Sequence, residues 1–227
     1  MVFLNKEILS AVYNERFPFW GELTDRDKAY LCDSSSVKFF KKGTTIYDSN
    51  DSGGVALLLS GSLRVYMISE QGKELTLLRL HKNELCIISA SFATEAIAFD
   101  ILIDAEEDCE CYYISDQTFR YINQKYPQAK IYALERTIDC MSDMIWVMEQ
   151  ILFMSMDKRL AIFLLDEINR GDTDTVMLTH SLIAKYMGSA REVVSRMLKY
   201  FENENIVSLS RKGVKILDKN RLRKLTQ

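Results

Sequence analysis

The sequence predicts an α+β protein with a strand-rich N-terminal half, a long helix, and a C-terminal pair of short helices followed by a hairpin. Three observations support this. Short apolar runs separated by glycines extend from about residue 19 to 115. A heptad pattern of apolar residues follows over residues 131–152, and two helical patterns with two short strands follow that. Short strands in a regular series with glycine turns indicate an antiparallel barrel or roll, which can enclose one small ligand.

The C-terminal stretch from residue 178 to 217 is the most informative part of the chain. At about 100° per residue, the second helix, from residue 190, separates its apolar and polar side chains into arcs of roughly 140° each. The polar arc holds Arg191, Glu192, Ser195, Arg196 and Lys199. Arginine can bridge both acceptors of guanine and glutamate can accept from the cytosine amine, so this face has the chemistry to read base edges in a major groove. The preceding helix, residues 181–187, ends at Gly188, as a helix-turn-helix requires.

The pattern of this helix also fits an ordinary amphipathic helix that has no role in DNA binding. Many amphipathic helices have a charged outer face, and Ser189 with Glu192 forms a capping-box pattern that needs no DNA. The context favours DNA, because residues 207–209 and 214–216 predict a hairpin around Arg211 and Lys212. A basic hairpin after such a helix is typical of a winged helix-turn-helix, whose wing would contact phosphates.

Charge is distributed unevenly along the chain, whose formal net charge is −3. Residues 156–227 hold 14 basic and 9 acidic residues, a net +5, whereas residues 1–155 hold 15 and 23, a net −8. This favours a DNA-binding domain joined to a separate sensory module. No apolar run is long enough to predict a membrane span, and the N-terminus reads as an amphipathic helix, not a signal peptide. Five cysteines without a secreted spacing pattern favour a reducing cytoplasm.

The middle of the chain predicts a homodimer. Apolar residues recur with alternating steps of three and four at Ile131, Leu134, Ile138, Met141, Ile145, Met148 and Leu152. Such a seam favours two copies of one helix packed side by side, although a helix packed on its own domain would show a similar pattern. Two recognition helices on a twofold axis would read a palindromic site with half-sites about one helical turn apart.

Taken together, the chain resembles the CRP/FNR family of transcription regulators, which includes the cAMP receptor protein and the fumarate–nitrate regulators. The resemblance covers nearly the whole chain and rests on the segments FFKKGTTIY, LLLSGSLRVYM and SAREVVSRMLKYFENENIVSLSR. It implies a double-stranded β-helix, a cyclic-nucleotide-binding-like jelly roll, over residues 1–124. It further implies a dimerisation helix over residues 125–155 and a winged helix-turn-helix over residues 156–227.

The resemblance also implies residue roles. Base reading would fall to Arg191, Glu192 and Arg196, and Ser195 matches a serine used by the fumarate–nitrate branch, so we expect a half-site containing G·C pairs. Further DNA contacts are expected from Thr179, His180, Ser189, Lys199 and Lys212. The expected partners are double-stranded DNA, a second copy of the chain, RNA polymerase and a small effector, with no membrane.

The sensory site departs from the cyclic-nucleotide pattern of the family. A Gly-Glu pair is replaced by Asn83-Glu84, and the Arg-Ser pair that holds the phosphate aligns with Phe99-Asp100. A phenyl ring cannot pair with a phosphate and a carboxylate repels one. No arginine occurs between Arg79 and Arg120 that could replace it. We therefore expect an effector other than cAMP, or none, in a pocket that includes Glu84, Phe99 and Asp100.

Other chemistries have little support in the sequence. The first cysteine is Cys32, so the N-terminal cysteine cluster of an iron–sulfur sensor is missing and we expect no such cluster. Cys109 and Cys111 share a strand face and could be a redox pair, half a metal site, or small core residues. Two histidines, and no phosphate-binding loop or nucleophile elbow, argue against haem and against an enzyme. The alternative to a DNA-binding regulator is a ligand-binding module whose C-terminal domain docks a protein.

Overall fold

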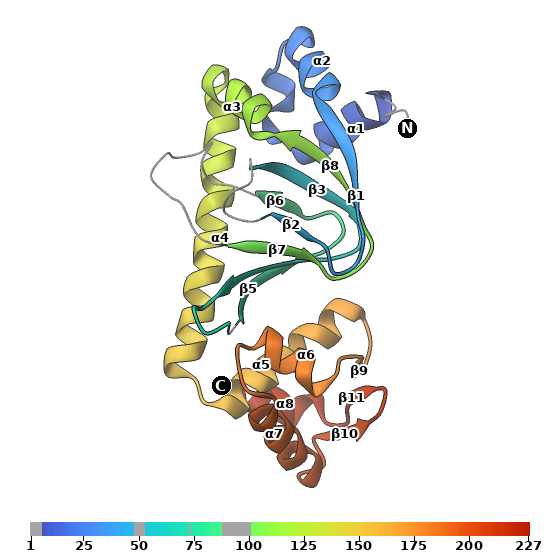
Figure 1. The fold of residues 1–227 in the computed structure, drawn as a ribbon, viewed down its shortest axis with the longest axis vertical. Coiled ribbons are helices and arrows are strands. Elements are labelled where there is room, and N and C mark those ends of the chain that lie inside the picture. The colour runs from blue at the N-terminus through green and yellow to red at the C-terminus, as the bar shows by residue number, and fades with distance from the viewer. Residues whose placement is uncertain (1–5, 48–52, 73, 88–100) are drawn as a thin grey trace. The chain divides into compact units, whose positions relative to one another are not determined.

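A computed structural model describes residues 6–47, 53–72, 74–87 and 101–227 (Figure 1). The chain divides into an N-terminal unit of residues 1–67 and 77–144 and a C-terminal unit of residues 68–76 and 145–227. Among the described helices, none combines the length and apolar character needed to cross a membrane. In chain order the elements are α1 (Lys6–Arg16), the 3₁₀ helix η1 (Pro18–Glu22), α2 (Asp25–Asp33), β1 (Ser35–Phe40), β2 (Thr45–Tyr47), β3 (Gly54–Ser60), β4 (Leu63–Ile68), β5 (Glu74–Leu80), β6 (Leu85–Ile87), β7 (Leu102–Ala105), β8 (Cys109–Ser115), α3 (Asp116–Lys125), α4 (Pro127–Phe153), α5 (Met156–Gly171), β9 (Thr175–Val176), α6 (His180–Tyr186), α7 (Arg191–Asn203), β10 (Val207–Ser210), β11 (Gly213–Ile216) and α8 (Lys219–Lys224).

Residues 6–16, 18–22 and 25–33 are helical, so the prediction of strands from about residue 19 is wrong up to residue 33. Pro18 opens the 3₁₀ helix, and Thr24 then caps α2 by accepting a hydrogen bond from the Asp27 amide at 3.3 Å. An N-cap threonine followed by acidic residues in the first turn stabilises a helix start. This local signal outweighs the apolar run before it.

A cluster around Asp27 joins α2 to α3. The buried carboxylate accepts hydrogen bonds from Lys125 Nζ at 2.5 Å, Tyr126 Oη at 2.5 Å, Thr24 Oγ1 at 2.7 Å and Tyr121 Oη at 3.0 Å. These contacts, with Lys125 the largest, hold the pKa of Asp27 well below its ordinary range. The ionised form is therefore stabilised in the folded protein.

The predicted antiparallel roll is confirmed, and its described residues form two four-stranded sheets, with strand orders β1-β8-β3-β6 and β2-β7-β4-β5. Inward side chains from both sheets form one core, which includes Leu58 from β3, Leu63 from β4 and Ile103 from β7. The turn from β3 to β4 requires glycine, because Gly61 has a φ of +82° and a Cβ atom there would lie 2.6 Å from the carbonyl oxygen of Asp108.

The predicted long helix is confirmed as α4, whose N-terminal part runs alongside the strands of the roll (Figure 1). Its buried positions in this part are the small residues Ala129, Ala133 and Thr137, which allow close approach to the neighbouring core. Six of the seven heptad residues are exposed in the single chain, and Leu134 is half-buried. The exposed heptad residues are Ile131, Ile138, Met141, Ile145, Met148 and Leu152.

The C-terminal unit packs its helices over a small sheet, with Leu164, Leu198, Phe201 and Val214 in one core. The sheet has three strands in the order β10-β11-β9, so the two-strand hairpin predicted from the sequence gains a third strand. β9 is only two residues long and pairs with β11. A strand that short carries no detectable periodicity, which is why the sequence did not reveal it.

Candidate nucleic-acid interface and ligand pocket

The second helix of the C-terminal motif, α7, is amphipathic as predicted. Val194, Leu198 and Phe201 are buried in the core of the C-terminal unit. The opposite face presents the side chains that the sequence assigned to base reading. Of these, Arg191, Glu192, Arg196 and Lys199 are exposed and Ser195 is half-buried. The structure therefore brings two guanidinium groups, a carboxylate and a hydroxyl together on one helix face.

The capping box considered for the start of α7 does not form. Ala190 is the N-cap residue, with extended backbone and no side-chain capping hydrogen bond. The Ser189 hydroxyl instead donates to Met156 Sδ at 3.8 Å, in α5. Glu192 lies in the first turn with its side chain exposed, where a carboxylate is favoured by the helix dipole.

The first helix of the motif, α6, begins and ends one residue earlier than predicted. Thr179 caps it by accepting a hydrogen bond from the Leu182 amide at 3.2 Å. After α6 the chain turns at Gly188, which has a φ of +59°. Ile183 and Ala184 are buried in the same core as the apolar face of α7, and this packing fixes the angle between the two helices.

One hydrogen bond joins the two helices across their polar edges. His180 Nδ1 lies 3.0 Å from Ser195 Oγ, and both side chains are half-buried. The sequence assigned each residue separately to DNA contact. It gave no signal that the two are partners, since they stand fifteen positions apart.

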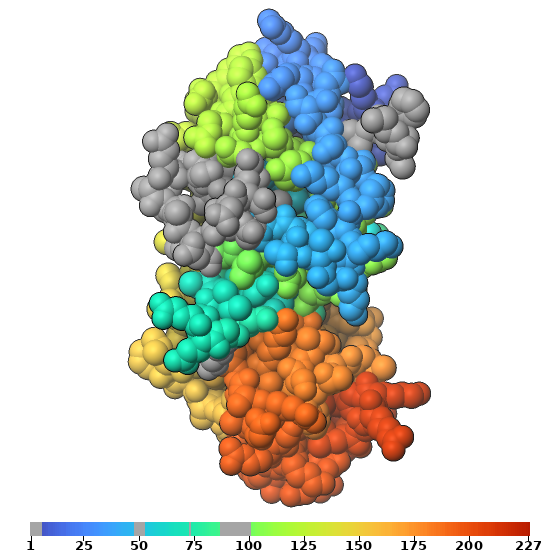
Figure 2. Space-filling view, in the orientation of Figure 1, coloured from blue at the N-terminus to red at the C-terminus, as the bar shows by residue number. Residues whose placement is uncertain are grey.

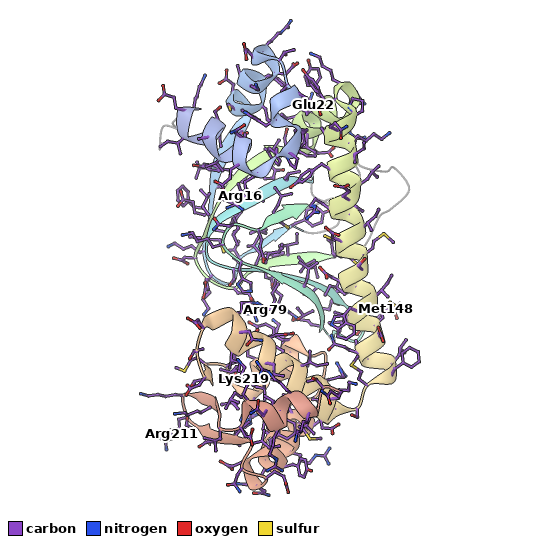
Figure 3. The ribbon with its side chains drawn as sticks, turned by 180° about the vertical axis from the view of Figure 1, so that it is seen from behind. Arg16, Glu22, Arg79, Met148, Arg211 and Lys219 are labelled. Carbon is purple, nitrogen blue, oxygen red and sulfur yellow. The ribbon has the colours of Figure 1, made fainter. Side chains whose placement is uncertain are left out.

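The wing is a tight basic hairpin between β10 and β11. Ser210 Oγ donates to the Gly213 carbonyl at 3.2 Å and accepts from the Lys212 amide at 3.1 Å, which shapes the turn. Arg211 and Lys212 are exposed, and the Arg211 side chain extends away from the unit (Figure 3). In the space-filling view the hairpin projects from the C-terminal unit (Figure 2). This is the placement expected for a phosphate contact.

Glu202 connects the recognition helix to the wing, a role that the sequence did not reveal. Its carboxylate accepts from the Leu209 amide of β10 at 3.1 Å and from Lys199 Nζ at 2.7 Å. The ammonium of Lys199, followed by the Leu209 amide, lowers the pKa of Glu202. Lys199, a predicted DNA contact, is thus already engaged with a carboxylate on its own helix.

A second candidate site lies in the N-terminal unit, as a cavity of about 480 Å³ lined by residues of α1, the roll and α4. Its apolar lining includes Leu57, Leu78 and Leu85. Glu84, predicted for the effector pocket, lines this cavity and also accepts a hydrogen bond from the His81 amide at 2.8 Å. The charged lining residues are Glu15, Arg16, Arg79, Glu84, Arg136, Asp139 and Asp143. The other two predicted pocket residues, Phe99 and Asp100, lie outside the described residues.

The arginines of this pocket are paired with carboxylates. Arg79 Nε, labelled in Figure 3, lies 2.7 Å from Glu106 Oε2, and both side chains are largely buried. Arg136 Nη2 lies 2.8 Å from Oδ2 of Asp139, which is three residues further along α4. Guanidinium groups that already neutralise carboxylates have less to offer a ligand phosphate.

Acidic side chains also face one another in the pocket. Burial raises the pKa of Asp143, and the nearby carboxylates of Asp139 and Glu84 raise it further. Like charges that already repel each other would repel an added anion as well.

The five cysteines are free thiols and four of them are buried. Cys109 and Cys111 lie on β8 with both side chains in the core of the roll, as their spacing predicted. Burial raises the pKa of Cys111 to about 11, and burial is also the main cause that raises the pKa of Cys86 and Cys140. Within the described ranges, no three His, Cys, Asp or Glu side chains gather as a metal site.

Both halves of the chain match known protein families. A family model described as a Crp-like helix-turn-helix domain matches residues 158–225, and one described as a cyclic nucleotide-binding domain matches residues 37–126. The chain is 26% identical over 187 residues to the cAMP-activated global transcriptional regulator CRP of Salmonella typhimurium, covering 78% of this chain and 87% of that protein.

Solved structures show the same architecture. A protein from Eubacterium rectale, described as a candidate transcriptional regulator of the Crp/Fnr family, aligns with a TM-score of 0.86 at 38% identity. The alignment covers 93% of this chain and 99% of that one. FixK2 from Bradyrhizobium japonicum shares the fold with a TM-score of 0.72 at 16% identity, over 85% of this chain and 98% of its own.

Proposed function

Because the chain belongs to the CRP/FNR family of transcription regulators, we propose that its homodimer binds a palindromic DNA operator through α7 and the wing. Membership of this family makes the chain a regulator and not an enzyme. The observation that carries the proposal is the exposed face of α7, where Arg191, Glu192 and Arg196 stand beside one another.

The chemistry of that face predicts what it reads. Arg191 and Arg196 can each bridge O6 and N7 of a guanine, and Glu192 can accept from N4 of a cytosine. The operator half-site should therefore contain G·C pairs. Arg211 and Lys212 of the wing would contact phosphates, which orient the protein without selecting a sequence.

The heptad face of α4 supports a homodimer. Its exposed isoleucines, methionines and leucine form an apolar stripe of the kind that two parallel helices bury between them. A twofold dimer would hold two copies of α7 about one turn of DNA apart, which matches a palindrome. RNA polymerase in the cytoplasm is the expected further partner of such a regulator.

Control by a small molecule other than cAMP fits the pocket of the N-terminal unit. The Salmonella relative is described as cAMP-activated, but in this pocket Arg79 and Arg136 are paired with carboxylates. The raised pKa values of the thiols make a redox signal the weaker alternative, because the thiolate is the reactive form. An iron–sulfur cluster has even less support, since Cys32 is the first cysteine of the chain.

The first experiment is selection of binding sites from random duplexes, with reduced protein, with oxidised protein, and without added ligand. An enriched palindrome supports the proposal, and its loss after oxidation would implicate the cysteines. No enrichment in either state would mean that a small effector is required, and the selection would be repeated after ligand screening. Binding that does not weaken with added salt would favour a protein partner over DNA, because phosphate contacts release counterions.

A substitution then tests the reading face. Arg196→Ala should cost about 1–3 kcal/mol on the selected operator and relax the preference at one base pair. Arg223→Ala removes an exposed arginine from α8 of the same unit and should leave base preference unchanged. If Arg196→Ala keeps both affinity and preference, the recognition model is wrong.

A further inference from the structure

The hydrogen bond between His180 and Ser195 lies at the centre of the proposed reading surface. Ser195 is on the same helix face as Arg191 and Arg196, and its hydroxyl oxygen is 3.0 Å from His180 Nδ1. Thr179 caps the first turn of α6 and so orders the backbone that carries His180. The contact therefore joins two half-buried side chains, one from each helix of the motif.

A lone serine is an ambiguous reader of DNA. Its hydroxyl has one hydrogen to donate and two lone pairs to accept with, so it can pair with donors or acceptors on a base edge. Each nitrogen of a neutral imidazole is either a donor or an acceptor. When Nδ1 accepts, the serine hydrogen is occupied and the serine offers only lone pairs, which suit N4 of cytosine or N6 of adenine. When Nδ1 donates, the serine hydrogen is available for an acceptor on guanine or thymine.

We propose that His180 is a positioning residue that sets the base specificity of Ser195. It does so by fixing the serine rotamer and by occupying one of the hydroxyl's hydrogen-bonding functions. This inference rests on the proposed DNA-binding function and goes beyond the DNA contact expected for His180 from the sequence, which a phosphate would satisfy. The second ring nitrogen, Nε2, is still available for such a contact, so one side chain could serve both purposes.

The two purposes differ in what they do to sequence preference. A phosphate contact strengthens binding to every duplex by the same factor, because phosphates carry no sequence information. A positioning contact changes the preference at only one base pair, the one that Ser195 reads. Selection experiments on variants therefore separate the roles, whereas a single affinity measurement does not.

The test uses site selection with the full chain and four variants. Ser195→Ala identifies the base pair that the serine reads, as the position whose preference weakens. His180→Phe removes the Nδ1 contact and should weaken preference at that same base pair by roughly 3- to 10-fold, the range of one net hydrogen bond. His180→Asn places an amide near the position of Nδ1 and should restore most of the preference. Combining His180→Phe with Ser195→Ala should add nothing at that base pair beyond Ser195→Ala alone.

Ser181→Ala, at the next and exposed position of α6, is the matched control and should leave every base preference unchanged. The inference is overturned if His180→Phe weakens binding to all duplexes equally while preference stays intact. It is also overturned if His180→Phe changes the preference at a different base pair from the one that Ser195→Ala identifies. A His180→Asn variant that unfolds at the wild-type temperature but does not restore the preference would overturn it as well. Wild-type protein that selects no sequence under any condition would overturn the proposed function itself, so the two failures are distinguishable.

Discussion

Shortening the exposed isoleucines of α4 should weaken the homodimer by a predictable amount. Ile138 and Ile145 are 60% and 61% exposed in the single chain. Burying a whole isoleucine side chain is worth about 1.5–3 kcal/mol, so covering the exposed part is worth about 1–2 kcal/mol. Each substitution removes two copies from a twofold dimer but leaves a methyl group, so we expect a loss of about 1–3 kcal/mol per dimer. The dimer dissociation constant should rise by a factor of about 5 to 150.

Sedimentation equilibrium over a concentration series, without DNA, measures this change for Ile138→Ala and Ile145→Ala. Alanine is a better helix former than isoleucine, so the substitutions do not weaken α4 itself. Ile8→Ala is the matched control, because Ile8 is 55% exposed on α1 and does not belong to the heptad. Unchanged dissociation constants for both α4 variants, with helix content preserved, would show that the heptad stripe is not the interface.

Three further predictions concern the rest of the molecule. Asp27→Asn should lower the free energy of unfolding at pH 7 by about 2–3 kcal/mol, because hydrogen bonds to a charged group are lost. The pKa of Asp27 is lowered by folding, so this stability is present above the unfolded value of about 3.9 and is lost as the pH falls further. Urea unfolding at pH 7 and pH 3 should therefore show a smaller difference between variant and wild type at pH 3, and an equal difference contradicts the reasoning. Gly213→Ala should lower the melting temperature more than Gly43→Ala. Both glycines have positive φ, but only the Cβ at residue 213 would clash, 2.1 Å from the carbonyl oxygen of Val176; equal shifts in calorimetry would contradict this. Brief peroxide treatment should leave operator affinity unchanged, because burial raises the pKa of the thiols, and a loss of affinity that Cys140→Ser prevents would restore the redox hypothesis.

The parts of the fold that the sequence predicted are those with a long and regular pattern. In α7, Val194, Leu198 and Phe201 repeat with helical spacing and are all buried. The heptads of α4 likewise give a helix whose existence does not depend on any single contact. Strand alternation with glycine turns was sufficient for a roll, although the start of the strands was placed too early in the chain.

The parts that escaped prediction depend on contacts between segments far apart in the sequence. Glu202 binds the Leu209 amide only because β10 folds back along α7. The His180–Ser195 bond requires the angle between two helices, which the core sets and no local pattern reveals. The pocket shows the same limit. The comparison with the family pattern predicted Glu84 as a pocket residue, but it did not predict Arg79 or Asp143, which lie on other elements. Residue types indicate the chemistry of a site, but which of those residues contact one another depends on the fold.

The pocket and the proposed dimer interface lie on neighbouring faces of α4. Tyr132, Arg136, Asp139 and Asp143 line the pocket with steps of four, three and four, and the first and third of them directly follow Ile131 and Ile138 of the heptad. One residue along a helix is a rotation of about 100°, so the pocket stripe and the heptad stripe lie on adjacent faces of one rigid element.

Where α4 has one arrangement in the monomer and another in the dimer, a ligand that prefers the dimer arrangement also stabilises the dimer. Its effect is limited to its difference in affinity between the two arrangements, and complete switching from 1:99 to 99:1 needs about 5.5 kcal/mol. Coupling of this kind is reciprocal. Ile138 does not line the pocket, so Ile138→Ala weakens the dimer without removing a ligand contact. In a coupled protein, the dimeric wild type and the monomeric variant must differ in ligand affinity. The factor must equal the one by which the ligand shifts the dimerisation constant. An effector whose affinity is identical in wild type and Ile138→Ala, measured where only the wild type is dimeric, does not act by shifting dimerisation.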